Sequence, residues 1–165
     1  MRPNERILLA LDDSDASRRA LGFVAREAAA GPPVRVTVGT VRRPLPPELL
    51  ESRGAEDPVD EERIECGLRA RQQRAAGAAV DDAARTLADA RTTLERAGVA
   101  EVDAASIDGT GHDVAERIVA LADATGCRTI VVGRSSFPWL AELLREHVAD
   151  RLREIAGGRT VHVVE

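Results

Sequence analysis

Lysine is absent from this 165-residue chain, and arginine supplies all 23 of its basic side chains. A P-loop is therefore excluded, because its phosphate-binding core requires a Gly-Lys-Ser/Thr sequence. Aromatic residues are also scarce: Phe23, Phe137 and Trp139 are the only ones, and tyrosine is missing. With a net charge of −5 and so few rings for bases to stack on, we expect no nucleic-acid partner.

Long hydrophobic runs are missing too, since no apolar stretch approaches the roughly 20 residues that a membrane helix needs. The first residues do not form a secretory signal. The two cysteines, Cys66 and Cys127, have neither metal-binding nor redox spacing. We therefore expect a cytoplasmic protein with no metal site and a single domain over residues 1–165. The bias toward arginine, alanine, valine and glycine indicates a GC-rich bacterial genome.

Short apolar runs alternate with amphipathic segments along the chain, which predicts an α/β fold with a parallel sheet and helices on both faces. Strands are expected at residues 6–11, 34–41, 102–107, 129–132 and 160–164, with the third at a sheet edge. Helices are expected at residues 14–31, 61–97, 114–126 and 140–155. Gly67 and Gly77 weaken the first half of the second helix, which leaves a continuous helix and a helix broken there as alternatives. Residues 42–60 contain four prolines and predict a long loop with one helical turn near residues 48–51.

Two strand ends carry the polar residues that suggest a binding site. The first strand ends in Asp12-Asp13-Ser14, and the fourth is followed by Gly133-Arg134-Ser135-Ser136. Backbone N–H groups at such strand-to-helix turns attract anions, phosphate above all. If the two strands lie side by side, their ends form a crevice for a small molecule. The alternative is that both turns only cap helices.

Residues 7–21, ILLALDDSDASRRAL, resemble the opening of universal stress proteins, and residues 129–164 resemble their closing segment. The resemblance implies a three-layer, Rossmann-like fold with an open parallel five-stranded sheet in the order 3-2-1-4-5. Strands one and four then flank the ligand crevice. It further implies a non-enzymatic protein of the stress response, with a homodimer formed through the last strand, residues 161–164.

In ATP-binding members of that family an aspartate after strand one contacts adenine, and Asp12 matches it. Val41 matches a residue beside the base. The full set of residues that the resemblance places at the nucleotide is Ala10, Leu11, Asp12, Val41, Val132, Gly133, Arg134, Ser136, His147 and Val148.

The phosphates of those members lie on a Gly-x-x-Gly-x9-Gly-Ser/Thr pattern, from which this chain departs. Gly133 matches the first glycine, but Ser136, Glu146 and His147 occupy the other three positions. A carboxylate about 4 Å from a phosphate repels it by about 1 kcal/mol even in water. Asp13, at a usual glycine position, adds another negative charge. We therefore expect ATP binding to be weak or absent, with AMP, ADP, another small anion or an empty crevice as alternatives.

Without the third glycine, residues 139–155 would form one continuous helix that closes the triphosphate pocket. A second class of function, phosphoryl transfer, stays open at this point. Asp12-Asp13 is also typical of response-regulator receivers, and residues 13–17 resemble the Asp-x-Asp-x-Thr start of haloacid-dehalogenase phosphatases. Both chemistries use Mg²⁺ and usually a lysine on the transferring phosphoryl group. The absence of lysine disfavours both.

Overall fold

The computed structural model describes residues 4–42, 45–50, 58–109, 114–134, 136 and 148–165. Its strands form one parallel sheet in the order β3-β2-β1-β4-β5, as the resemblance implied. The predicted edge position of the third strand is confirmed. The strands are β1 (Glu5–Leu11), β2 (Val34–Arg42), β3 (Glu101–Asp108), β4 (Thr129–Gly133) and β5 (Thr160–Val164). Ala10 of β1 lies opposite Val132 of β4, so the two predicted strand ends are neighbours.

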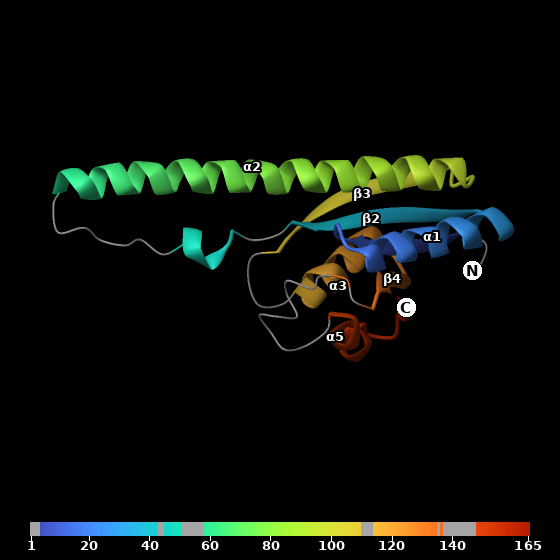
Figure 1. The fold of residues 1–165 in the computed structure, drawn as a ribbon. Helices are drawn as coiled ribbons and strands as arrows, with labels where there is room; N and C mark the ends of the chain where they lie inside the picture. Colours follow the sequence, from blue (N-terminus) through green and yellow to red (C-terminus); the bar gives the residue numbers. More distant parts are fainter. Residues whose placement is uncertain (1–3, 43–44, 51–57, 110–113, 135, 137–147) are drawn as a thin grey trace.

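Helices cover both faces of the sheet (Figure 1). On one face lie α1 (Asp15–Ala30) and α2 (Pro58–Arg96), and on the other lie α3 (Val114–Thr125) and α5 (Val148–Ile155). Alternate side chains of β1 enter the two cores: Ile7 and Leu9 pack with α1 and α2, while Leu8 packs with α3 and α5. A strand buried on both faces reads as a continuous apolar run, which explains the ILLAL sequence.

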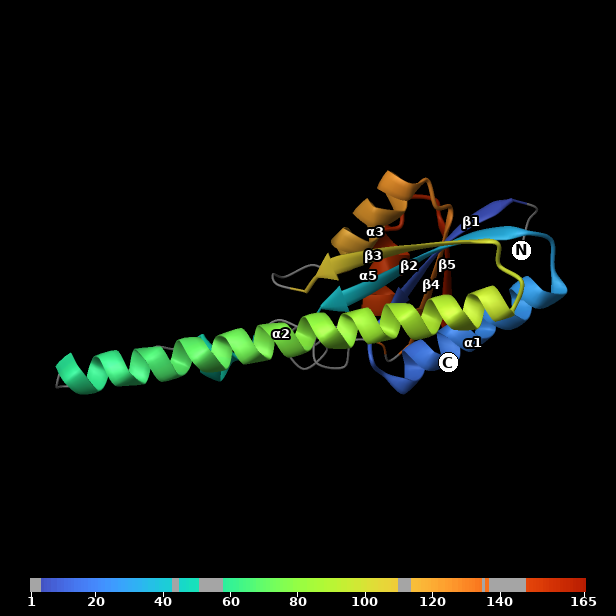
Figure 2. The same ribbon diagram turned by 90° about the horizontal axis from the view of Figure 1, so that it is seen from above.

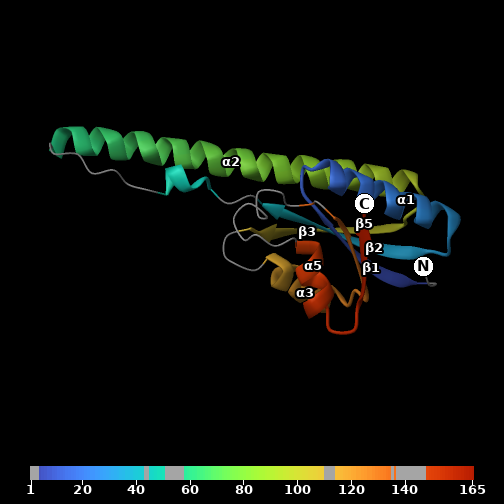
Figure 3. The same ribbon diagram turned by 60° about the horizontal axis from the view of Figure 1, so that its bottom comes forward.

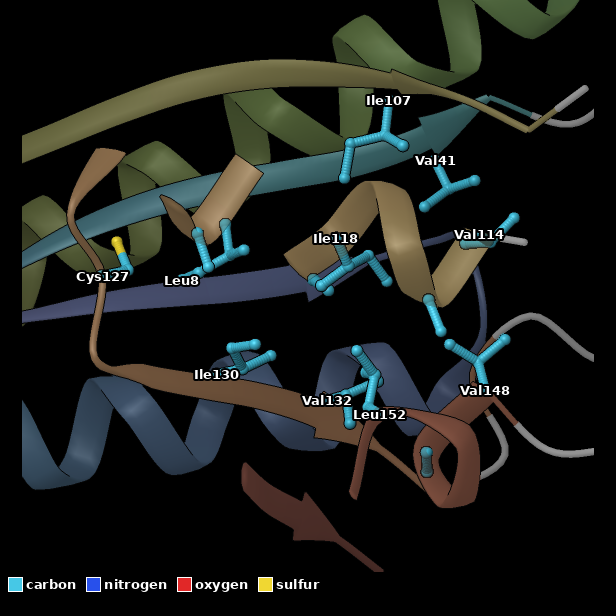
Figure 4. Close-up of a cluster of buried hydrophobic side chains, with 14 residues drawn as sticks. Leu8, Val41, Ile107, Val114, Ile118, Cys127, Ile130, Val132, Val148 and Leu152 are labelled. Carbon is cyan, nitrogen blue, oxygen red and sulfur yellow. The ribbon is translucent and has the colours of Figure 1, made fainter. Parts of the chain in front are cut away.

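The core beneath α3 and α5 is drawn in Figure 4. Leu8, Ile118, Ile130 and Leu152 are fully buried there, and they come from β1, α3, β4 and α5. Cys127 is also buried in this cluster, as a reduced thiol. Four elements that are distant in sequence thus meet in one core, which fixes the carboxyl ends of β1 and β4 relative to each other.

The long second helix predicted over residues 61–97 is confirmed, and the alternative of a break within it does not occur. Helix α2 runs unbroken for 39 residues, about 58 Å at 1.5 Å per residue, through Gly67 and Gly77. Each glycine costs about 1 kcal/mol of helix propensity relative to alanine. The helix persists because its carboxyl-terminal half is anchored by Ala90 and Leu94, both fully buried, and extension from a formed helix is cheaper than nucleation. Figures 2 and 3 show its amino-terminal half extending past the sheet.

The predicted loop between the second strand and this helix contains one helical turn, η1 (Pro47–Leu49), one residue earlier than expected. The predicted last helix is described only as α5; residues 139–147, and with them the expected continuity of that helix, lie outside the described residues. Within the described ranges, no helix is long and apolar enough to cross a membrane.

Candidate functional site

The turn from β1 into α1 is organised by Asp12. Ser14 is the N-cap of α1, with extended backbone, and its hydroxyl accepts a hydrogen bond from the Ser17 backbone N–H. Asp12 Oδ1 in turn accepts hydrogen bonds from the Ser14 N–H at 3.1 Å and from the Ser14 hydroxyl at 2.5 Å. The Asp12 residue is only 5% exposed. Its carboxylate therefore stabilises the start of α1, where the helix dipole favours negative charge.

A buried hydroxyl, Ser17, connects this turn to the end of β4. Its hydroxyl donates to Asp12 Oδ1 at 2.5 Å and accepts from the Asp12 N–H at 2.9 Å. The Ser136 hydroxyl lies 3.0 Å from it. Because a serine hydroxyl has one proton and Ser17 gives it to Asp12, Ser136 must be the donor to Ser17. The two strand ends are thus joined by a chain of hydrogen bonds from Asp12 through Ser17 to Ser136.

Gly133, the last residue of β4, is required by packing. A Cβ at this position would lie 2.5 Å from the backbone carbonyl carbon and oxygen of Ala16, and 2.7 Å from the Ser136 hydroxyl. The first turn of α1 therefore occupies the space that any side chain would need. The missing side chain at Gly133 allows α1 to lie directly against β4, whether or not a phosphate approaches from the other side.

Arg134 points its guanidinium toward the end of the chain. Its Nε donates to the Glu165 carboxylate at 2.5 Å, and its backbone N–H donates to the carbonyl of Val164 at 2.8 Å. The hydrogen bond to Glu165, together with the negative charge of that carboxylate, raises the pKa of Arg134. The guanidinium of Arg134, which the family resemblance places at the nucleotide, is thus paired with the Glu165 carboxylate beside β5.

A cleft of about 250 Å³ opens at the carboxyl ends of β1 and β2. Asp12, Asp13 and Val41 line it from the sheet, and Leu45 and Pro46 from the segment after β2. Helix α2 forms the opposite wall with four alanines, Asp82 and Thr86. The complete lining is Asp12, Asp13, Thr40, Val41, Leu45, Pro46, Ala75, Ala78, Ala79, Asp82, Ala83 and Thr86. Three carboxylates and no basic side chain belong to this described lining, so the cleft is electrically negative.

A second groove, of about 440 Å³, lies between α1 and α2 and shares Asp12, Asp13, Asp82 and Thr86 with the cleft. Its two arginines are engaged by neighbouring carboxylates on their own helices. Arg18 pairs with Asp15 at 2.6 Å and lowers the pKa of that carboxyl, through a hydrogen bond and its charge. Arg85 pairs with Asp82. The groove thus adds no unpaired arginine beside the shared aspartates.

Apart from Arg134, the residues predicted for the nucleotide divide into three groups. Ala10, Leu11, Val132 and Gly133 lie together with Asp12 and Ser136 at the junction of β1 and β4. Val41 and Val148 belong to the hydrophobic core under α3 and α5, although Val41 also lines the cleft. His147, like Glu146, lies outside the described residues.

Sequence reasoning missed the wall that α2 contributes. Ala75, Ala79 and Ala83 recur every four residues, the spacing of one helix face, and this recurrence was the available signal. Ser17 lies near the start of the helix expected at residues 14–31 and was given no role beyond that, whereas it is the buried link between the two strand ends.

A sequence model described as the universal stress protein family matches residues 3–156. The chain belongs to the universal stress protein family. The resemblance inferred from the two ends of the sequence is therefore confirmed, and membership favours this reading over a receiver or a phosphatase. No curated protein matches the chain.

Solved structures of this family share the fold at low identity. A member from Burkholderia pseudomallei is 22% identical, with a TM-score of 0.54 over 97% of this chain and 95% of its own. A universal stress protein in complex with cAMP is 18% identical, with a TM-score of 0.59 over 99% and 98%. The hypothetical protein MJ0577 is 19% identical, with a TM-score of 0.63 over 99% and 96%. At such identities the likeness shows the fold alone.

Proposed function

We propose that this universal stress protein is a non-enzymatic regulatory module that binds a small adenine nucleotide in the cleft at the ends of β1 and β2, and binds ATP weakly or not at all. The cAMP complex of a protein with this fold supports a nucleotide ligand of low charge. Asp12 and Val41, which the family resemblance assigns to the base, line the same cleft. The base would lie against them and against the alanine wall of α2.

The observation that carries the proposal is the charge of the cleft. Asp12 and Asp13 line it, Asp82 adds a third carboxylate that also pairs with Arg85, and the described lining contains no arginine. A phosphate charge about 4 Å from one carboxylate loses about 1 kcal/mol at the dielectric of water, or roughly fivefold in affinity, and more in a low-dielectric cleft. Each added phosphate therefore lowers affinity.

The size of the cleft points the same way. A volume of about 250 Å³ is below the roughly 300–1,000 Å³ of ordinary ligand pockets. A nucleoside with one phosphate is a better match to this volume than a nucleoside triphosphate.

The test is calorimetric titration of the purified protein with cAMP, AMP, ADP and ATP, with and without Mg²⁺. We expect affinity to fall from the monophosphates to ATP. In Asp82→Asn, which keeps the shape of the side chain, ATP affinity should rise more than AMP affinity. Equal affinity for AMP and ATP would show that the carboxylates do not oppose the phosphates and would refute the proposal. So would a failure of all four ligands to bind.

Two further measurements separate the parts of this proposal. The double variant Glu146→Gly/His147→Ser restores the family pattern at those two positions, and we expect it to bind ATP more tightly than the wild type. Release of phosphate from ATP by the purified protein would contradict the non-enzymatic part.

We also propose a homodimer formed through β5, which lies at the edge of the sheet. Val161 and Val163 pack only partly into the core, and His162 is exposed beside Phe23, with ring centroids 6.1 Å apart. An edge strand of this kind tends to be covered or paired. An antiparallel pair about His162 would bring the two copies of that residue together, so His162→Cys in a Cys66→Ala background should cross-link as a dimer. A failure to cross-link, against Glu154→Cys as control, would contradict it.

A further inference from the structure

The amino-terminal half of α2 has little of its own protein to pack against. Figures 1 and 2 show it extending beyond the sheet, with η1 beside it. Gln72 Nε2 donates to the carbonyl of Leu49 at 2.6 Å, which ties the helix to η1. The large hydrophobic side chains exposed in the described part of the chain lie in or near this half: Ile64 (44% exposed) is within it, Val80 (48%) is just beyond its end, and Leu50 (64%) directly follows η1. Because helices in water depend on tertiary packing, this half should have a partner.

The charges in the middle of α2, residues 66–84, are segregated. Arg69, Arg71 and Arg74 precede the uncharged segment Ala75–Val80, and Asp81 and Asp82 follow it, whereas acidic and basic residues are mixed in the rest of the helix. This middle stretch is therefore basic at one end and acidic at the other. A second copy laid antiparallel along it would match basic to acidic at both ends of the stretch, whereas a parallel copy in register would oppose like charges.

Arg74 and Asp81 lie on one face of α2, and there the opposite charges of the two copies would come closest. Arg74, Gly77 and Asp81 are spaced by three and four residues, so they share a face of the helix, and all are exposed. Neighbouring charges are paired within the helix, as Arg69 is with Glu65. Among the described residues, neither Arg74 nor Asp81 has an ion-pair or hydrogen-bond partner.

Most side chains on the same face are small, so a second helix can approach it closely. The alternating spacing of three and four residues continues on either side of Arg74, Gly77 and Asp81, and is the repeat that keeps two helices in contact. Its other members are all small: Gly67, Ala70, Ala84 and Ala88. A Cβ at Gly67 or Gly77 would meet nothing within 4 Å. On the opposite side of the helix, Ala90 and Leu94 are buried against the sheet, so this face points away from the domain.

From this arrangement we propose that a second copy of the chain docks antiparallel along α2, with the two-fold axis between Gly77 and Ala78. Arg74 then lies opposite the partner's Asp81, and Asp81 lies opposite the partner's Arg74. This interface is separate from the β5 edge and does not rest on nucleotide binding.

Cross-linking tests the register directly. In a Cys66→Ala background, Gly77→Cys places the two introduced thiols within about 2 Å of each other along the helix axis. Gly67→Cys on the same face places them about 30 Å apart. Both variants replace an exposed helix glycine, so they are matched. We expect a short bismaleimide to cross-link Gly77→Cys into a covalent dimer and to leave Gly67→Cys uncross-linked at the same concentration.

Charge reversal in the Gly77→Cys reporter tests the cause. In the antiparallel pair, Arg74→Asp places an aspartate opposite Asp81 of the other copy at both symmetry-related contacts. We therefore expect at least a fivefold fall in cross-link yield. Asp81→Arg opposes arginines and should do the same. The double variant Arg74→Asp/Asp81→Arg restores complementarity and should restore the yield. A Gly77→Cys yield no greater than that of Gly67→Cys would overturn the proposal, as would a yield insensitive to either reversal. Helix content measured by circular dichroism confirms that each variant folds.

Discussion

The substitution Gly133→Ala adds one methyl group where β4 meets α1, and its effect can be worked out from the geometry. The added carbon would lie 2.5 Å from the backbone carbonyl of Ala16, about 1 Å inside ordinary carbon contact distance. A flexible side chain could rotate away, but this neighbour is backbone in the first turn of α1. That turn is fixed by Ser14 and by the hydrogen bonds of Asp12. Relief therefore requires α1 to move away from the sheet.

Forcing an extra methyl into a packed region costs about 1–3 kcal/mol, and a backbone neighbour places this case in the upper part of that range. We expect Gly133→Ala to lose about 2–3 kcal/mol of unfolding free energy. For a domain of this size that lowers Tm by about 4–12 °C. Urea unfolding followed by circular dichroism gives the free energy, and a thermal scan gives the Tm.

The matched control is Gly67→Ala, which adds the same methyl on the exposed part of α2 where nothing lies within 4 Å. Alanine is the better helix former, so this variant should gain about 0.5–1 kcal/mol. If Gly133→Ala is as stable as the wild type and loses only nucleotide affinity, the packing explanation is wrong and the glycine serves the ligand instead.

Three other substitutions test the site. Ser17→Ala removes the buried hydroxyl that bonds Asp12 and Ser136, and should cost about 1–3 kcal/mol in urea unfolding; a change below about 0.5 kcal/mol would contradict the hydrogen-bond account. Ala79→Leu fills the cleft from the α2 wall, so calorimetry should detect no nucleotide binding while stability is retained; unchanged affinity would place the ligand elsewhere. Arg134→Ala should leave ATP affinity unchanged within about twofold, because that side chain is bound to Glu165. A tenfold loss would show that Arg134 reaches the phosphates.

Much of the fold could be predicted because its elements have local signatures. The strand Glu5–Leu11 is buried on both faces, so every residue from Ile7 onward is apolar and the run cannot be mistaken for a surface segment. The order of the strands is not a local property, and it came from the resemblance to a family. The sequence left the continuity of α2 open at Gly67 and Gly77, because propensity counts the cost of each glycine and not the packing that anchors the helix elsewhere.

The candidate site was less predictable for a different reason. Gly133 was recognised from its place in a phosphate motif, but the contact that requires a glycine is with Ala16, far away in sequence. The engagement of Arg134 by Glu165 depends on how β4 and β5 lie side by side. The alanines that wall the cleft recur every four residues, but that signal is weak because alanine is common on every face of this helix.

The distribution of fixed and adjustable residues suggests where ligand preference resides. Asp12 and Ser17 hold the start of α1, so a change at either alters the fold together with the cleft. Ala79 and Asp82 line the opposite wall from a helix anchored elsewhere, at Leu94, and can change without disturbing the sheet. A larger side chain at position 79 would reduce the volume of the cleft, and a neutral side chain at position 82 would reduce the repulsion of a ligand's phosphates. If the cleft binds a nucleotide as proposed, the α2 wall would control which nucleotide is accepted, and the proposed pairing of two α2 helices would hold that wall in place.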